Sequence, residues 1–149
     1  MKYFFLESSA LAKLFVLEAG SEALIRLVEQ VEDSRKLLSS LAALEVRSAI
    51  RRRQRAGEIQ SADADYALDS LFSEVLRMVE QPITSSVVDM ARYVLDNHSL
   101  RAMDALHLAT CMVARDTLQV TDICFVSSDE ALLDAAEAER FEVLDPLEM

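Results

Sequence analysis

Residues that interrupt or cross-link a fold are scarce in this chain: its 149 residues include two glycines, two prolines and two cysteines. No stretch is rich in glycine, proline or serine, so no linker or low-complexity segment is predicted. Cys111 and Cys124 do not form a CxxC pair, and we interpret both as small buried residues. We therefore expect residues 1–149 to form one domain with a substantial hydrophobic core.

Long apolar runs and targeting signals are also missing. No run approaches the roughly 18 residues that a membrane-spanning helix needs. The first residues contain neither the basic segment nor the small-residue cleavage site of a secretory signal peptide. On these grounds we expect a cytoplasmic protein that has no membrane partner.

Basic residues are in the minority, with 15 lysines and arginines against 26 acidic residues and a net charge of −11. This balance argues against a large basic surface that binds nucleic acid by releasing counterions. It is compatible with a metal-dependent nuclease, because bound divalent cations would neutralise part of the acidic charge. The basic residues are also unevenly spread. Five arginines crowd into one short stretch: Arg47, Arg51, Arg52, Arg53 and Arg55.

Hydrophobic residues make up 52% of the chain and follow two alternating patterns. Short apolar runs predict strands at residues 3–6, 36–39, 78–83, 123–127 and 142–144. Helical spacing predicts helices at residues 9–20, 21–31, 41–56, 61–76, 85–97, 102–115 and 129–140. This alternation predicts an α/β domain with a mostly parallel sheet and helices on both faces. Ligands of such sheets gather at the carboxyl ends of the strands.

Four carboxylates stand in unusual places. Glu7 ends the first apolar strand, and Asp129 follows a later strand after two serines. Glu45 and Asp104 lie inside apolar helical segments, LAALEV and AMDALHLA. A carboxylate on or beside a buried face is costly unless it is paired or holds a metal. Together the four acids predict a site for hard divalent cations such as Mg²⁺, because such cations prefer oxygen ligands. Two such ions about 4 Å apart can hold a phosphodiester between them.

Each of these acids also has a structural interpretation. Asp129 could cap the last helix, and Asp104 could sit in a first helical turn for the sake of the helix dipole. Glu45 could pair with Arg47 or Arg101. Glu7 has the weakest structural interpretation, although Ser8 or Ser9 beside it can cap the first helix.

Several further features have two interpretations. We interpret His107 as a hydrogen-bonded core histidine rather than as a general base. Arg101 could reach either a carboxylate or an RNA phosphate. The arginine stretch is either a solvated helix end or a track for RNA that includes Arg51 and Arg52. The apolar face of Tyr66, Leu71, Phe72 and Val75 is interpreted as core, with a dimer or partner surface as the alternative.

Four segments follow one another along the chain: FFLESSALAKLF, SSLAALEVRSAI, SLRAMDALHLAT and FVSSDEALL. In this order they resemble the motifs of PIN-domain ribonucleases, in particular VapC-type toxins. The resemblance implies a PIN-like three-layer α/β/α sandwich and a metal-dependent endoribonuclease. It also implies Mg²⁺ or Mn²⁺ as cofactor, an RNA substrate, a cognate antitoxin and a homodimer. By position, it makes Glu7, Glu45, Asp104 and Asp129 the catalytic and metal-binding residues, with Ser8 and Ser127 orienting carboxylates or water.

The chain departs from the family pattern at the first acidic position, where the family has aspartate and this chain has Glu7. One extra methylene moves the carboxylate by roughly 1.5 Å, and a misplacement of about 1 Å can slow catalysis on the order of 100-fold. The alternative function is therefore a weakened or inactive PIN-like module that binds antitoxin or RNA.

A phosphoacceptor receiver domain would need paired acids after the first strand. A haloacid-dehalogenase-type phosphatase would need a DxD motif there. Residues 7–9, which follow the first predicted strand, are Glu-Ser-Ser and supply neither the paired acids nor the DxD motif.

Overall fold

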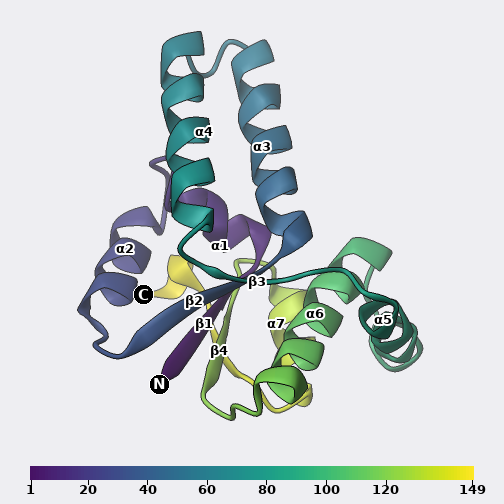
Figure 1. The fold of residues 1–149 in the computed structure, drawn as a ribbon. Coiled ribbons are helices and arrows are strands. Elements are labelled where there is room, and N and C mark those ends of the chain that lie inside the picture. The colour runs from purple at the N-terminus through teal and green to yellow at the C-terminus, as the bar shows by residue number, and fades with distance from the viewer.

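Five parallel strands form the centre of the molecule, which a computed structural model describes over residues 1–149. In chain order they are β1 (Lys2–Leu6), β2 (Ser34–Ser39), β3 (Val79–Gln81), β4 (Ile123–Val126) and β5 (Glu142–Leu144). Their order across the sheet is β3-β2-β1-β4-β5, and every neighbouring pair is parallel. The predicted parallel α/β sheet is therefore confirmed, with β1 at its centre (Figure 1).

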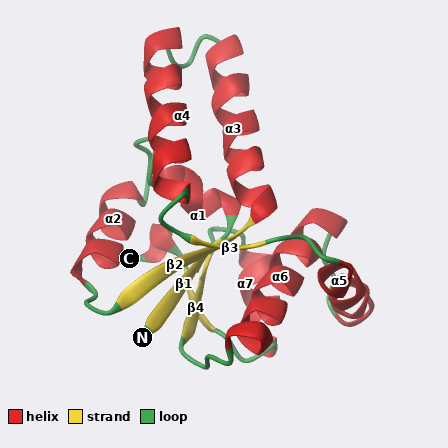
Figure 2. Ribbon diagram, viewed as in Figure 1, coloured by secondary structure: helices red, strands yellow, loops and turns green.

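Seven α-helices surround this sheet (Figure 2). They are α1 (Ser8–Lys13), α2 (Ser21–Gln30), α3 (Ser40–Arg55), α4 (Ser61–Val75), α5 (Ser85–Asn97), α6 (Ala102–Leu118) and α7 (Glu130–Ala138), and a 3₁₀ turn, η1 (Pro146–Glu148), ends the chain. Buried residues of α5, α6 and α7 pack on one face of the sheet, and those of α1 to α4 pack on the other. This arrangement is the expected three-layer α/β/α sandwich. None of these helices combines the length and the hydrophobicity that a membrane-spanning segment requires.

The central strand β1 explains why both layers hold to the sheet. Successive side chains of a strand point to opposite faces. Phe4 and Leu6 enter the core under α1 to α4, and Phe5 enters the core under α5 to α7. Phe5 stacks on Phe125 of β4 with ring centroids 5.1 Å apart. An uninterrupted apolar run is therefore the sequence that a doubly covered parallel strand requires.

The order of the strands fixes where a site can form. From β1 the chain moves outward through β2 to β3 and then returns to build β4 and β5 on the other side of β1. The direction of winding thus reverses between β1 and β4, and at such a switch point the loops leave the carboxyl ends of the strands in opposite directions. Glu7 follows β1 directly, and Asp129 comes soon after β4 ends at Val126.

The first helix differs from its prediction at both ends. Glu7, rather than Ser8 or Ser9, is its N-cap, and the helix ends at Lys13 instead of continuing towards Gly20. The hydroxyl of Ser21 donates to the carbonyl of Val16 and accepts from the backbone N–H of Glu18. These two backbone groups are therefore hydrogen-bonded although they lie in a loop and not in a helix. Gly20 instead caps α2 with φ of 87°, a left-handed conformation that suits glycine.

The interpretation of the α4 apolar face as core is wrong for its two aromatic residues. Leu71 is buried, whereas Tyr66 is 76% exposed and Phe72 is 66% exposed. The hairpin of α3 and α4 extends beyond the sheet, where α4 has only α3 to pack against (Figure 1). The apolar stripe on α4 is wider than the surface that α3 can cover, so these aromatic side chains remain in solvent.

Two phenylalanines provide a matched test of this packing. We expect Phe5→Ala, at a fully buried site, to lower the free energy of unfolding by about 3–5 kcal/mol. The same change at the exposed Phe72 should alter it by about 0.5 kcal/mol or less. Urea denaturation followed by circular dichroism measures both. Equal losses from the two variants would contradict the difference in burial between the two side chains.

Candidate functional site

The carboxylate of Glu7 lies at the end of β1 and is only 7% exposed. Its Oε2 accepts three hydrogen bonds: from the backbone N–H of Ser9 at 3.1 Å, from the Ser9 hydroxyl at 2.5 Å and from the Ser127 hydroxyl at 2.9 Å. These donors compensate the burial of a charged group, which would otherwise be costly. The second oxygen, Oε1, accepts no hydrogen bond from the protein, so it is free for another ligand.

Ser9 also ties the start of α1 to the turn after β4, and Ser127 makes a local bond within that turn. The hydroxyl of Ser9 accepts a hydrogen bond from the backbone N–H of Ser128 at 3.0 Å. The hydroxyl of Ser127 accepts one from the backbone N–H of Asp129 at 3.0 Å. The sequence motifs predict Ser127 as a supporting residue but not Ser9. The signal that could have identified Ser9 is the Ser-Ser pair that follows each of the two apolar strands.

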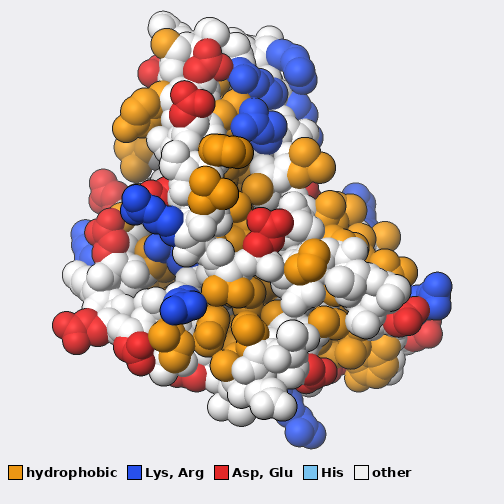
Figure 3. Space-filling model, viewed as in Figure 1, with side chains coloured by type: hydrophobic (Ala, Val, Ile, Leu, Met, Phe, Trp, Pro, Cys, Tyr) orange, Lys and Arg blue, Asp and Glu red, His pale blue; other side chains and the backbone are white.

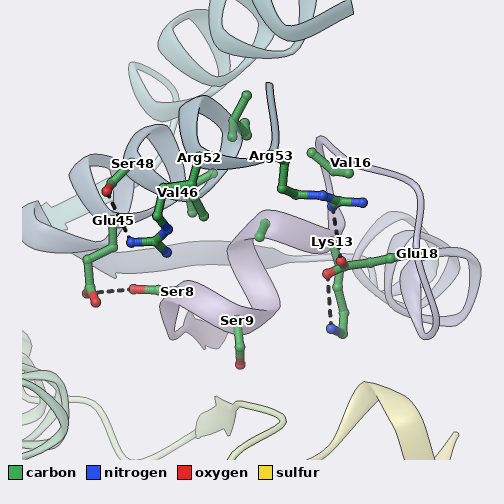
Figure 4. A pocket seen from close by; sticks show the side chains of 13 residues that line it. Ser8, Ser9, Lys13, Val16, Glu18, Glu45, Val46, Ser48, Arg52 and Arg53 are labelled. Atoms are coloured by element: carbon green, nitrogen blue, oxygen red, sulfur yellow. Dashed lines mark hydrogen bonds and ion pairs between the residues drawn. The ribbon is translucent and has the colours of Figure 1, made fainter. Parts of the chain in front are cut away.

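Glu45 comes from α3 and is held by two side chains from other helices. The hydroxyl of Ser8 donates to its Oε1 at 2.8 Å, as Figure 4 shows, and the same oxygen contacts Nε2 of His107 on α6. Neither Arg47 nor Arg101 pairs with it, so that structural interpretation of Glu45 is wrong. Burial raises the pKa of the Glu45 carboxyl, but the hydrogen bonds from His107 and Ser8 outweigh burial and lower the pKa below its usual value.

His107 is a hydrogen-bonded core histidine, as expected, and its partners belong to the site. Its ring is 1% exposed, and Nε2 also lies 3.3 Å from the Ser8 hydroxyl. Burial lowers the pKa of its imidazole, but the hydrogen bond to Glu45 and the surrounding carboxylates together raise it above its usual value. The buried Nδ1 has no partner. His107 therefore connects α6 to α3 and α1 through one nitrogen.

Asp104 lies in the first turn of α6, half buried, and its side chain makes no hydrogen bond within the protein. Burial is the main reason that its pKa is raised. The charges of Asp129, Glu7 and Glu45 raise the pKa further, whereas His107 opposes them. The carboxyl of Asp104 thus senses all three of the other predicted acids, which come from separate segments of the chain.

Asp129 has the structural role that the sequence allowed for it. It is the N-cap of α7, and its Oδ1 accepts a hydrogen bond from the backbone N–H of Leu132 at 3.0 Å. Its side chain is exposed, and its other oxygen makes no hydrogen bond. A helix cap uses one carboxylate oxygen, so capping leaves the second oxygen available to a ligand.

The four acids offer the donor chemistry that a hard divalent cation prefers, since all of their donor atoms are carboxylate oxygens. Burial is the main cause of the raised pKa of Asp104, and the charges of the other three acids add to it, so these charges oppose that of Asp104. As they stand, however, no three histidine, cysteine or acidic side chains are grouped closely enough to hold an ion. The donor set therefore suits Mg²⁺ or Mn²⁺, and a full coordination sphere would need water or side-chain movement.

The three arginines singled out in the sequence have different surroundings. Arg51 donates to Gln54 at 2.7 Å and to Asp65 of α4 at 3.1 Å. Arg52 makes a single, long hydrogen bond to the Ser48 hydroxyl at 3.4 Å. Arg101 precedes α6, is exposed, and has no side-chain partner. Figure 3 shows basic side chains gathered on the hairpin that α3 and α4 form.

Comparisons with known proteins agree with one another. The family model described as PIN domain matches residues 4–138. A curated protein named Ribonuclease VapC35, from Mycobacterium tuberculosis, is 31% identical over 142 residues, which are 95% of this chain and 96% of that protein. A toxin–antitoxin complex from Klebsiella pneumoniae has a similar fold, with a TM-score of 0.64, 13% identity and 98% coverage of both chains. VapBC2 from Rickettsia felis, solved with a promoter DNA fragment, gives a TM-score of 0.65 and 10% identity over 97% of this chain and 98% of that one.

The repulsion between Asp104 and the other three acids predicts how metal ions change the free energy of unfolding. We expect Mn²⁺ at 100 times its dissociation constant to raise the free energy of unfolding by about 2.7 kcal/mol. Asp104→Asn should stabilise the metal-free protein, because it removes a charge that three carboxylates oppose, and should weaken the response to Mn²⁺. Thermal unfolding with Mn²⁺ or EDTA measures both effects. Asp69→Asn, an exposed site on α4, is the control; if it behaved like Asp104→Asn, the predicted site would be contradicted.

Proposed function

Because this chain belongs to the PIN domain family, we propose that it is a metal-dependent endoribonuclease that acts as the VapC-type toxin of a toxin–antitoxin pair. The proposal is supported by the positions of Glu7 and Asp129 just after β1 and β4, and by the raised pKa of Asp104, to which burial contributes most and the charges of Asp129, Glu7 and Glu45 contribute further. Similarity to a protein named as a ribonuclease over nearly the whole chain supports RNA as the substrate.

Mg²⁺ or Mn²⁺ would be held by these four carboxylates. When bound, such ions supply an activated water and stabilise the charge of the leaving oxygen of a phosphodiester. The protein's own contribution is to present the ligands. Ser9 and Ser127 fix one oxygen of Glu7 and leave the other free, and Ser8 and His107 do the same for Glu45. Asp104 and the free oxygen of Asp129 complete the set.

The longer side chain of Glu7 is compatible with this function. Three hydrogen bonds hold its Oε2 in one place, so the extra methylene does not leave the carboxylate loose. A carboxylate with a fixed position can serve as a ligand if the rest of the site is arranged around it. We therefore favour a working enzyme over the alternative, a PIN-like module that binds RNA or antitoxin without cleaving.

The acidic site and its RNA substrate carry charge of the same sign. RNA phosphates would be repelled by four carboxylates until cations neutralise them, and exposed arginines such as Arg52 and Arg101 would assist the approach.

An antitoxin would inhibit by placing a basic side chain among the same carboxylates. The exposed apolar side chains of Tyr66, Phe72 and Leu76 on the hairpin are candidates for contacts with the antitoxin or with a second copy in a homodimer.

RNA cleavage with the antitoxin removed tests the proposal. We expect cleavage of single-stranded RNA that requires Mg²⁺ or Mn²⁺ and stops in EDTA. Glu7→Ala should slow it on the order of 100-fold or more, because one ligand is lost. Asp69→Asn should cleave as the unaltered chain does. Cleavage that appears only in Glu7→Asp would support the inactive module instead, and silence of every folded variant would contradict the enzyme.

A pair of substitutions at His107 tests the positioning of Glu45. In His107→Gln, the side-chain amide can still place a donor near the Glu45 carboxylate, whereas His107→Leu fills the space without a donor. We expect His107→Leu to lower kcat on the order of 10- to 100-fold with little change in KM, and His107→Gln to recover most of the rate. Equal loss in both variants, with equal stability, would mean that the histidine only packs.

A further inference from the structure

A pocket of about 360 Å³ lies between α1 and α3, and Glu45, one of the four predicted acids, lines it. Ser8 and Glu45 form its wall on the side of the site. Arg52, Arg53 and Lys13 also line the pocket; in Figure 4, Arg52 lies on the side of Ser48 and Glu45, whereas Arg53 and Lys13 meet Glu18 on the other side. A molecule in this pocket would therefore be in contact with the candidate site at one end and with basic side chains at the other.

The lining of the pocket carries more positive than negative charge. Its charged residues are Lys13, Glu18, Glu45, Arg52 and Arg53, which give three cations and two anions. Such an excess stands out in a chain whose net charge is −11. Basic side chains concentrated in a concave surface attract anions far more than the same charges spread over a surface.

The cations differ in how fully they are paired. Lys13 is 7% exposed, and its Nζ meets Glu18 at 3.2 Å. Arg53 shares Glu18 at 3.6 Å and also contacts Glu58 at 3.3 Å. Arg52 has no acidic partner, and its one hydrogen bond, to Ser48, is long at 3.4 Å. Most of the guanidinium donors of Arg52 are therefore free.

These donors suit an anion that has several oxygens. A guanidinium presents its N–H groups as a planar fork, which matches two oxygens of a phosphate at once. Ser48 adds a hydroxyl group beside Arg52. Glu45 and Arg52 are seven positions apart on α3, which is roughly 10 Å at 1.5 Å per residue. That separation lies within the reach of a few nucleotides of one strand.

We propose that this pocket binds a backbone phosphate of single-stranded RNA, on one side of the phosphodiester that the carboxylates address. The inference rests on the proposed ribonuclease function and adds a second contact to it, with Arg52 as the main ligand of the phosphate and Lys13 and Arg53 as supporting charges. An acidic segment of a partner protein is the competing occupant. RNA is favoured because the pocket includes Glu45, one of the four carboxylates among which a phosphodiester would lie.

The experiment measures RNA binding without cleavage. A fluorescently labelled single-stranded RNA with 2′-O-methyl groups is titrated with the Asp104→Asn chain in Mg²⁺ at several salt concentrations. We expect the further change Arg52→Gln to weaken binding about tenfold, since a charge-assisted hydrogen bond is lost. The slope of log affinity against log salt should fall by about 0.7, the value for one phosphate contact on a single strand.

Arg55→Gln in the same background is the matched control. Arg55 lies three residues further along α3, is exposed, forms no ion pair and does not line the pocket. It should leave both the affinity and the salt slope within experimental scatter. In the chain with Asp104 intact, Arg52→Gln should raise KM for RNA with kcat nearly unchanged, as expected for a contact made equally in ground and transition states.

Three results would overturn the inference, and they are distinguishable from failure of the proposed function. If Arg52→Gln and Arg55→Gln change binding equally while the unaltered chain cleaves RNA, the pocket is not a phosphate site although the ribonuclease stands. If a glutamate-rich peptide, but not RNA, binds in a manner that depends on Arg52, the occupant is an acidic protein segment. If the unaltered chain neither cleaves nor binds RNA, both proposals fail.

Discussion

The three hydrogen bonds to Oε2 of Glu7 are the interaction on which the site depends. A buried carboxylate without partners would cost on the order of several kcal/mol. Its partners come from the start of α1 and from the turn after β4, and the backbone N–H of Glu7 also donates to the carbonyl of Val126 at 3.1 Å. These contacts exist only if β1 and β4 pair in the observed register, with Leu6 opposite Val126. The packing of the sheet and the position of the first acid are thus fixed together.

Beyond Glu7, the site includes three more carboxylates whose charges have the same sign, and only two of them have hydrogen-bond partners in the protein. Glu45 has Ser8 and His107 as partners, and Asp129 has a cap to fulfil, but Asp104 has no hydrogen bond and faces the charges of the other three. Proteins accept such local conflict at functional sites and compensate for it elsewhere. In this molecule the two hydrophobic cores on either side of β1 provide that compensation. A divalent cation would relieve the same repulsion, and this links the geometry to the proposed metal chemistry.

The sequence predicted the parts of the molecule whose signals are local. Apolar runs located the five strands, and the repeated strand, serine and acid pattern located Glu7 and Asp129 at one edge of the sheet. Features that depend on which helices meet were not predictable. The partner of Glu45 is His107, which is 62 positions away and comes into contact only because α3 and α6, which cover opposite faces of the sheet, bring these two side chains together. Likewise, the exposure of Tyr66 and Phe72 follows from the length of the hairpin beyond the sheet, and no pattern within α4 contains that information.

An acidic nuclease must bring an anionic substrate to a cluster of carboxylates, and we propose that bound cations and the basic pocket beside Glu45 share that task. The central claim is that the four acids form one cation site. Crystals grown with Mn²⁺ and measured at a wavelength where manganese scatters anomalously would test this claim most directly. We expect an anomalous peak between the free oxygen of Glu7 and the carboxylate of Asp104, with Asp129 or Glu45 within reach. A peak elsewhere, or none at a Mn²⁺ concentration that stabilises the protein, would contradict the claim.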